Sequence, residues 1–221
     1  MVTHKLALQT SRHLQDYLLC FECEQLLRAK GEDWVIPQLA RDGDAFPLGD
    51  TLKSSQHLFD EPDVVAYALE GHPTIRATDL VHFAMGIFWK SSVHNWLAEK
   101  KKSFISLGTR QESIRKFLLG EQGFPSDMAL SIAVLPKPVA LIGFHFPYET
   151  LPRPEDRTFH LYISGINFTL WAGTRIPPEI ILGCLSKRPH IALVYDAAPQ
   201  IARRYKEALA DSRKARKLRL S

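Results

Sequence analysis

The chain has few cysteines and no long apolar run. Three cysteines in 221 residues are an odd number that does not make a disulfide framework in a chain of this length, and they favour a reducing, cytoplasmic setting. The most apolar helical stretch, residues 80–89, is followed by Lys90 and is far shorter than the about 20 residues of a membrane span. Residues 1–16 lack the apolar core of a signal peptide. We therefore expect a soluble protein that does not associate with membranes.

Sequence motifs of the common catalytic classes are also lacking. The chain has no P-loop, no GxGxxG and no GxSxG, which argues against a nucleotide-driven enzyme. His82 and His94 are 12 positions apart and do not form an i, i+4 metal pair, so we interpret them as one helix-surface and one buried histidine. Asp79 is expected to favour the start of its helix. No catalytic residue is identified.

Charge is unevenly distributed along the chain. Residues 203–221 carry eight basic side chains against Glu207 and Asp211, a charge of +6, which leaves −2 of the total +4 for residues 1–202. Such a tail can bind nucleic-acid phosphates, or it can be a solvated terminal helix that packs its apolar side on the domain. The candidate nucleic-acid-binding residues are Arg203, Arg204, Lys206, Arg213, Lys214, Arg216, Lys217 and Arg219.

Hydrophobic periodicity and turn residues predict an α+β fold. Helices are expected at 61–71, where Asp60, Pro62 and Gly71 supply start and stop signals, and at 77–101 and 110–120. β-Branched and aromatic residues predict a largely antiparallel sheet between 128 and 195. The expected organisation is a half zinc-knuckle at 1–34, an α+β body at 35–202 and a basic helical tail at 203–221.

The stretch DYLLCFECEQLL, residues 16–27, contains Cys20 and Cys23. A CxxC turn supplies two of the four ligands of a structural zinc site, and His4, His13 and Cys184 are the further candidate ligands. A redox CxxC is also considered, but Glu22 and Glu24 would raise the pKa of a thiol there. The remaining alternative is that both cysteines are small core residues. Zinc is therefore the expected cofactor under the first of these three interpretations.

DYLLCFECEQLL resembles the second half of an HNH-type (treble-clef) zinc knuckle. The longer stretch from YLLCFECEQLLRAKGEDWV through FAMGIFWKSSVHNW resembles a group of uncharacterised bacterial proteins with an HNH-like N-terminus. The resemblance implies that Cys20 and Cys23 bind metal. Glu24 stands where the nuclease motif has a histidine, and no CxxC precedes Cys20, so the motif is degenerate and the chain looks N-terminally shortened relative to that group.

Three functions are compatible with these features. The first is a zinc-knuckle protein of degenerate HNH type that associates with DNA, RNA or a nucleic-acid-processing partner, without catalysis of its own. The alternative is a non-enzymatic interaction module, acting on a protein partner or as a homodimer, whose cysteines are structural. The third is a metal-dependent nuclease that is active only with a missing N-terminal portion.

Overall fold

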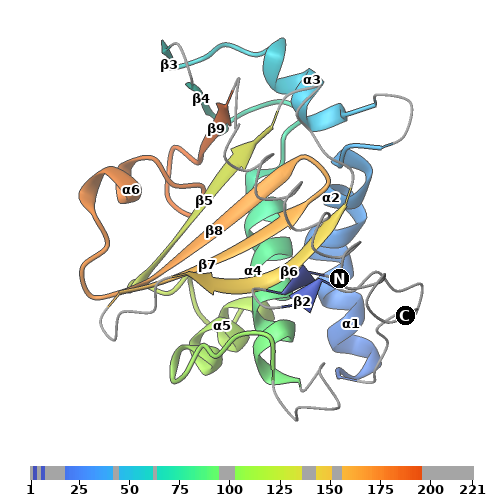
Figure 1. Ribbon diagram of the computed structural model, residues 1–221. Coiled ribbons are helices and arrows are strands. Elements are labelled where there is room, and N and C mark those ends of the chain that lie inside the picture. Colours follow the sequence, from blue (N-terminus) through green and yellow to red (C-terminus); the bar gives the residue numbers. More distant parts are fainter. Residues whose placement is uncertain are drawn as a thin grey trace, which may run out of the picture.

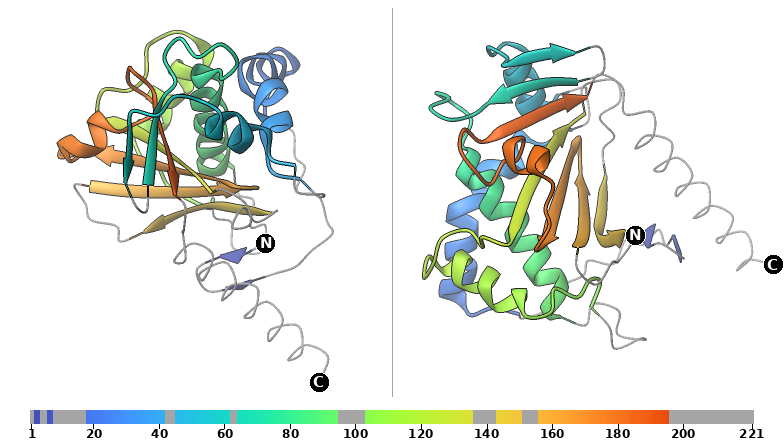
Figure 2. Two further views of the ribbon diagram at one scale, coloured as in Figure 1. Left: turned by 90° about the horizontal axis from the view of Figure 1, so that it is seen from above. Right: turned by 90° about the vertical axis from the view of Figure 1, so that its left-hand side faces the viewer.

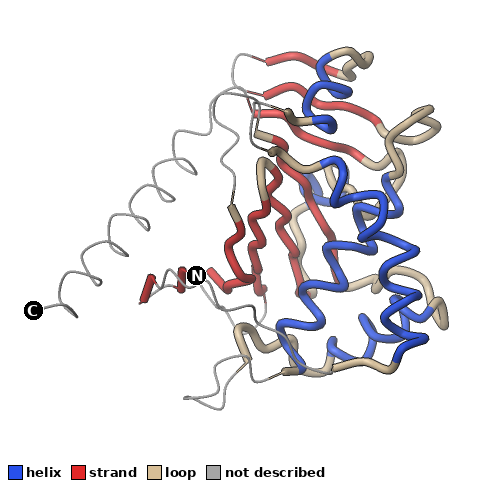
Figure 3. The backbone as a smooth tube through the Cα atoms, turned by 90° about the vertical axis from the view of Figure 1, so that its right-hand side faces the viewer, coloured by secondary structure: helices blue, strands red, loops and turns tan. Residues whose placement is uncertain are grey.

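The fold is two-layered, with a sheet covered on one face by helices (Figures 1 and 3). The computed structural model describes residues 18–41, 45–61, 64–94, 103–135, 143–150 and 156–195, together with the backbone of two short N-terminal strands. These strands, β1 (Val2–Thr3) and β2 (Leu6–Ala7), pair with each other. The α+β class is confirmed. None of the helices in these ranges has the length and apolar character needed to cross a bilayer.

Seven strands form the main sheet, in the order β3-β4-β9-β5-β8-β7-β6. Five of the six pairings are antiparallel, but β5 and β9 run parallel, so the sheet is mixed rather than purely antiparallel. The strands are β3 (Phe59–Glu61), β4 (Val64–Ala68), β5 (Met128–Val134), β6 (Phe144–Thr150), β7 (Asp156–Ile163), β8 (Ile166–Gly173) and β9 (Ile191–Tyr195).

The helix predicted at 61–71 is wrong, because β3 and β4 lie there. β4 pairs with β3 on one side and with β9 on the other, where Val64 faces Tyr195. Its sequence, VVAYA, is rich in the β-branched and aromatic residues that fit a pleated surface. The long-range partner in β9 therefore decides the conformation over the local cap and stop signals.

Helices cover one face of this sheet (Figures 1 and 2). They are α1 (Phe21–Leu27), the π-helix η1 (Arg28–Glu32), α2 (Asp33–Gln38), α3 (Pro47–Lys53), α4 (Ala77–Val93), α5 (Arg110–Leu119) and α6 (Pro178–Leu182). The first three are continuous in sequence. The sequence EQLLRAK followed by Gly31 predicts a short helix that ends at this glycine, and this prediction is wrong because the helical segment continues through Gly31. Gly31 instead lies against the backbone of Phe83 on α4.

The central core helix predicted from residue 77 is α4, and its start is confirmed. Leu80, Ala84 and Phe88 are fully buried, and the ring of Phe83 contacts that of Phe168 on β8 at a centroid separation of 6.3 Å. These contacts join the helical layer to the sheet. α4 ends at Val93, and residues 95–101 of the predicted helix lie outside the described residues.

The remaining sequence predictions concern the helix at 110–120 and the two ends of the chain. The helix predicted at 110–120 is confirmed as α5, which ends before Gly120. The sequence DYLLC, residues 16–20, predicts a short strand that leads into the cysteines, but residues 18–20 are not in a strand. The basic helical tail and its eight candidate residues lie outside the described residues, as do His4 and His13.

Candidate functional site

Cys20 and Cys23 lie at the start of α1, where Cys20 is the N-cap residue. The thiol of Cys20 is exposed and that of Cys23 is partly exposed, and the two side chains are hydrogen-bonded to each other. The first-turn bond from the Glu24 amide to the Cys20 carbonyl, 3.0 Å long, fixes the backbone between them. The two sulfurs are therefore close enough to bind one ion, and they are not core residues.

The pKa of the Cys23 thiol is raised by its surroundings. The hydrogen bond with Cys20 raises the pKa of the Cys23 thiol, burial and the negative charge of Glu22 raise it further, and Arg115 on α5 acts in the opposite direction. A thiol-disulfide enzyme needs a thiol of lowered pKa. The raised pKa of Cys23 makes this one thiol a poor nucleophile for such an enzyme. A zinc ion can displace thiol protons when it binds.

The other residues considered for a knuckle lie elsewhere. Glu24, at the position of the nuclease histidine, pairs with Lys90 of α4 at 3.4 Å, and Lys90 also pairs with Glu32 at 3.3 Å. Cys184 is buried just after α6, with its thiol donating to the Ile181 carbonyl. α6 and α1 are well separated in Figure 1. Within the described ranges no three His, Cys, Asp or Glu side chains form a potential metal site.

A second candidate site lies at the start of α4, which the sequence alone did not identify. A cavity of about 420 Å³ opens between four segments: η1, the first turns of α4, the end of α5 with the residues after it, and the segment before β9. We call it the α4 cavity. Its volume falls in the range of small-molecule sites. Its charged and titratable lining residues are Lys30, Arg76, Asp79, His82 and His190.

Asp79 and Arg76 form an ion pair at the mouth of the α4 cavity. Asp79 is 6% exposed, and its Oδ2 lies 2.8 Å from Nη2 of Arg76. Burial raises the pKa of the Asp79 carboxyl, and Arg76 lowers it in part. The N-cap residue of α4 is Arg76, and its side chain makes no capping hydrogen bond. The first turn therefore adds its partial positive charge to this end of the cavity.

His82 lies one turn further along α4 and is 7% exposed. Its Nε2 lies 3.0 Å from the Leu118 carbonyl, and because a carbonyl only accepts, Nε2 carries the proton. The Nδ1 lone pair is buried and has no hydrogen-bond partner among the described residues. Burial lowers the pKa of His82. An unsatisfied buried acceptor of this kind costs about 1–3 kcal/mol and often marks a functional position.

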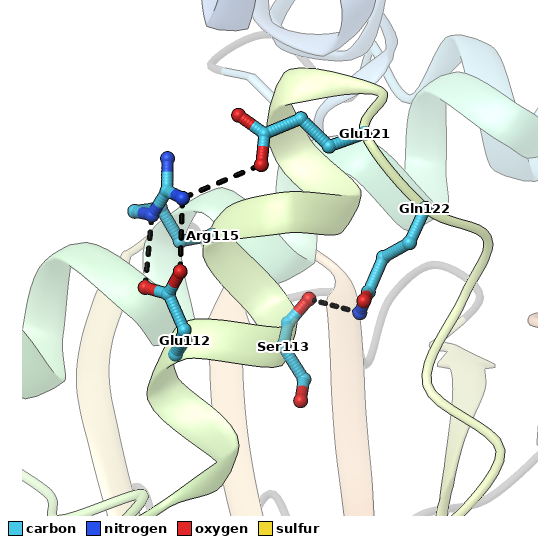
Figure 4. Close-up of polar contacts among 5 residues, drawn as sticks. All are labelled: Glu112, Ser113, Arg115, Glu121 and Gln122. Carbon is cyan, nitrogen blue, oxygen red and sulfur yellow. Dashed lines mark hydrogen bonds and ion pairs between the residues drawn. The ribbon is translucent and has the colours of Figure 1, made fainter.

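The wall formed by α5 is held in place by polar contacts (Figure 4). Arg115 makes two bonds of 2.9 Å to the Glu112 carboxylate and a longer one of 3.4 Å to Glu121. Gln122, which lines the cavity, donates to the Ser113 carbonyl at 2.7 Å. The segment after α5 is thereby tied back onto the helix. This arrangement gives the cavity a defined wall.

His82 on α4 should make the free energy of unfolding depend on pH. Because the folded-state pKa of His82 is lowered, its contribution is present above the unfolded value of about 6.5 and is lost as pH falls toward the folded value, at up to about 1.4 kcal/mol per pH unit. We expect His82→Gln to remove the part of this slope that His82 contributes, and to keep the rest. Urea unfolding between pH 7.5 and 5 measures it.

The matched control for this prediction is His57→Gln, at an exposed histidine, which should leave the wild-type slope. Burial also lowers the pKa of His145, so part of the slope should persist in His82→Gln. An unchanged slope in His82→Gln would contradict the assignment of His82 as a neutral buried imidazole.

The comparisons with known proteins give no further guide to either site. No family model, curated protein or solved structure matches the chain.

The sequence contains one local signal for the α4 cavity. Asp79 and His82 are three residues apart on one helix, a spacing that places side chains on the same face.

Proposed function

We propose that Cys20 and Cys23 are two ligands of a structural zinc site, and that the protein uses this knuckle to associate with nucleic acid or with a nucleic-acid-processing partner. The observation that carries the proposal is the pair of accessible, hydrogen-bonded thiols at one helix start. Zinc in a structural site takes four ligands. The other two would come from His4 and His13, or from the CxxC of a second copy.

The nucleic-acid part of the proposal rests on the basic residues between Arg203 and Arg219. Each phosphate that a lysine or arginine neutralises releases counterions, so binding should weaken steeply with salt. The knuckle residues themselves add little positive charge, because Glu22 and Glu24 flank the cysteines. In this proposal zinc organises the N-terminal segment and the tail provides the affinity. Neither role requires catalysis.

The test is the metal content of the purified protein, measured by elemental mass spectrometry. We expect about one zinc per chain, or one per two chains if two copies share the site, and its complete loss in Cys20→Ser/Cys23→Ser. The control is Cys184→Ser, at a buried thiol that donates to a backbone carbonyl, which should keep its zinc. A wild-type protein without zinc would refute the knuckle.

The nucleic-acid half is tested separately on the same protein, by the salt dependence of its binding to a DNA duplex and to single-stranded RNA. Affinity that is independent of salt, or unchanged when residues 203–221 are deleted, would refute it. The zinc result would then stand alone.

One observation favours a protein contact as a second candidate function. Phe21 lies between the two cysteines and is 73% exposed. A large aromatic side chain in that position is typical of the residues that anchor protein interfaces. A discrete oligomer that dissociates in Phe21→Ser, in a protein without zinc, would support this function over the first.

A further inference from the structure

One cation in the lining of the α4 cavity has no ionic partner among the described residues. Arg76 is paired with Asp79, whereas Lys30 has no hydrogen bond or ion pair with any residue in the described ranges. Lys30 lines the cavity, and its ammonium lies 3.4 Å from where a side chain at Gly120 would begin. Two cations and one carboxylate thus leave the lining with a net positive charge, next to the uncapped start of α4.

Part of the cavity lining is apolar. Val81, Phe117 and Phe124 line it, and the rings of Phe117 and Phe124 meet edge to face at a centroid separation of 5.5 Å. The ring of His82 lies against Phe117 at 6.0 Å. Aromatic walls of this kind bind flat apolar groups through ring contacts. The cavity is therefore amphipathic, because its lining contains both charged side chains and aromatic rings.

Buried His82 indicates that this wall of the cavity is not built for apolar packing alone. Its side chain lines the cavity, is more than nine-tenths buried and keeps an acceptor nitrogen without a partner in the described structure. Apolar residues would fill such a position at lower cost if only packing were required. Together with the buried carboxylate of Asp79, it forms a cluster of titratable groups in a concave site, which is typical of functional sites.

We propose that the α4 cavity binds a small organic anion. Its carboxylate or phosphate group lies between Lys30 and the first turn of α4, where Arg76 and the helix dipole also favour negative charge. Its ring-sized apolar body lies against Phe117 and Phe124. This site is separate from the cysteine pair and does not depend on the function proposed for it.

The experiment is calorimetric titration of the full chain with four probes that share one ring: benzoate, phenyl phosphate, benzyl alcohol and benzylamine. We expect either anion to bind roughly tenfold or more tightly than the neutral alcohol, as a charged hydrogen bond provides, and benzylamine to bind most weakly. Inorganic phosphate, which lacks the ring, should also bind more weakly than phenyl phosphate. The preferred anion distinguishes a carboxylate ligand from a phosphate ester.

Two variants locate the site. Lys30→Gln should lose roughly tenfold in affinity for the preferred anion, whereas Lys116→Gln, at an exposed lysine on α5 that does not line the cavity, should bind as the wild type does. Ala29→Trp places a large ring at the exposed edge of the cavity and should block binding without changing a buried residue.

The proposal is overturned if no anionic probe binds at millimolar concentration, or if benzyl alcohol or benzylamine binds as tightly as the anions. It is also overturned if Lys30→Gln and Ala29→Trp, both folded by circular dichroism, keep the wild-type affinity. Retained binding in those two variants would place the anion elsewhere on the protein.

Discussion

Gly165→Ala is expected to lower the free energy of unfolding by about 2–4 kcal/mol. Ser164 and Gly165 form the two-residue turn between β7 and β8, and the φ angle of Gly165 is +89°. An L-residue pays about 1–2 kcal/mol for a left-handed conformation. An added Cβ would in addition lie 2.8 Å from Cζ of Phe46 and 3.2 Å from Cβ of Ala40, distances at which the neighbours must move.

Phe46 has little room to move away from a new side chain. It is 1% exposed, and its ring also lies so close to Gly49 that a Cβ there would be 2.6 Å from Cδ1. The amide of Ala40 donates to the Ser164 carbonyl at 2.9 Å, which ties the segment after α2 to the turn. The turn therefore anchors both the β7–β8 hairpin and the packing of Phe46.

Gly71→Ala is the matched control for this prediction. Gly71 also has a positive φ, +71°, but a Cβ there would meet no atom within 4 Å. The control should lose only the backbone cost, about 1 kcal/mol. Urea unfolding of both variants separates the two contributions. Equal losses would show that Phe46 accommodates the methyl group.

Gly31→Ala and Gly86→Ala should change stability in opposite directions, although both glycines lie where α1–η1 meets α4. A Cβ on Gly31 would lie 2.9 Å from N and 3.0 Å from Cα of Phe83. These are backbone atoms of a core helix, so the helices must separate, at a cost of about 1–3 kcal/mol. A Cβ on Gly86 would meet only the end of the Leu27 side chain, at 4.0 Å, and alanine should gain up to about 1 kcal/mol of helix propensity.

Thermal and urea unfolding of the two variants measure this difference. The same sign for both would mean that the contact between η1 and α4 is not as close as described. Because the altered side chain is a single methyl group in both cases, helix propensity favours both variants equally. The difference between them therefore reports the helix–helix contact alone.

Local sequence patterns were sufficient for the elements whose contacts are local. α5 lies where the hydrophobic periodicity predicts a helix, and it ends before Gly120. β7 and β8 lie where β-branched and aromatic residues predict strands, on either side of a tight turn. Residues 61–71 have equally clear helix signals, yet Val64–Ala68 is a strand because its partner β9 begins 123 residues after the strand ends. No local pattern contains that pairing. The parallel β5–β9 contact could not be predicted for the same reason.

The two candidate sites also differ in whether a local sequence pattern reveals them. Cys20 and Cys23 are three positions apart and were identified from their spacing alone. Lys30, Asp79 and His190 instead approach one cavity from three separate segments. From the sequence, Asp79 is a helix-start residue, and His82 one of two ordinary histidines. Only the packing of η1, α5 and the segment before β9 around α4 makes them a cluster.

The position of β9 has a consequence for the order in which the chain folds. β3 and β4 join the other strands of the main sheet only through β9, which is the last described strand in the sequence. During synthesis, the β3–β4 hairpin and the edge of β5 must therefore wait unpaired until residue 195 has emerged from the ribosome. Unpaired strand edges are prone to aggregation, and a sheet closed by such distant segments is slow to form. Completion of the sheet is thus a late event in folding, which must follow the synthesis of Ile191–Tyr195.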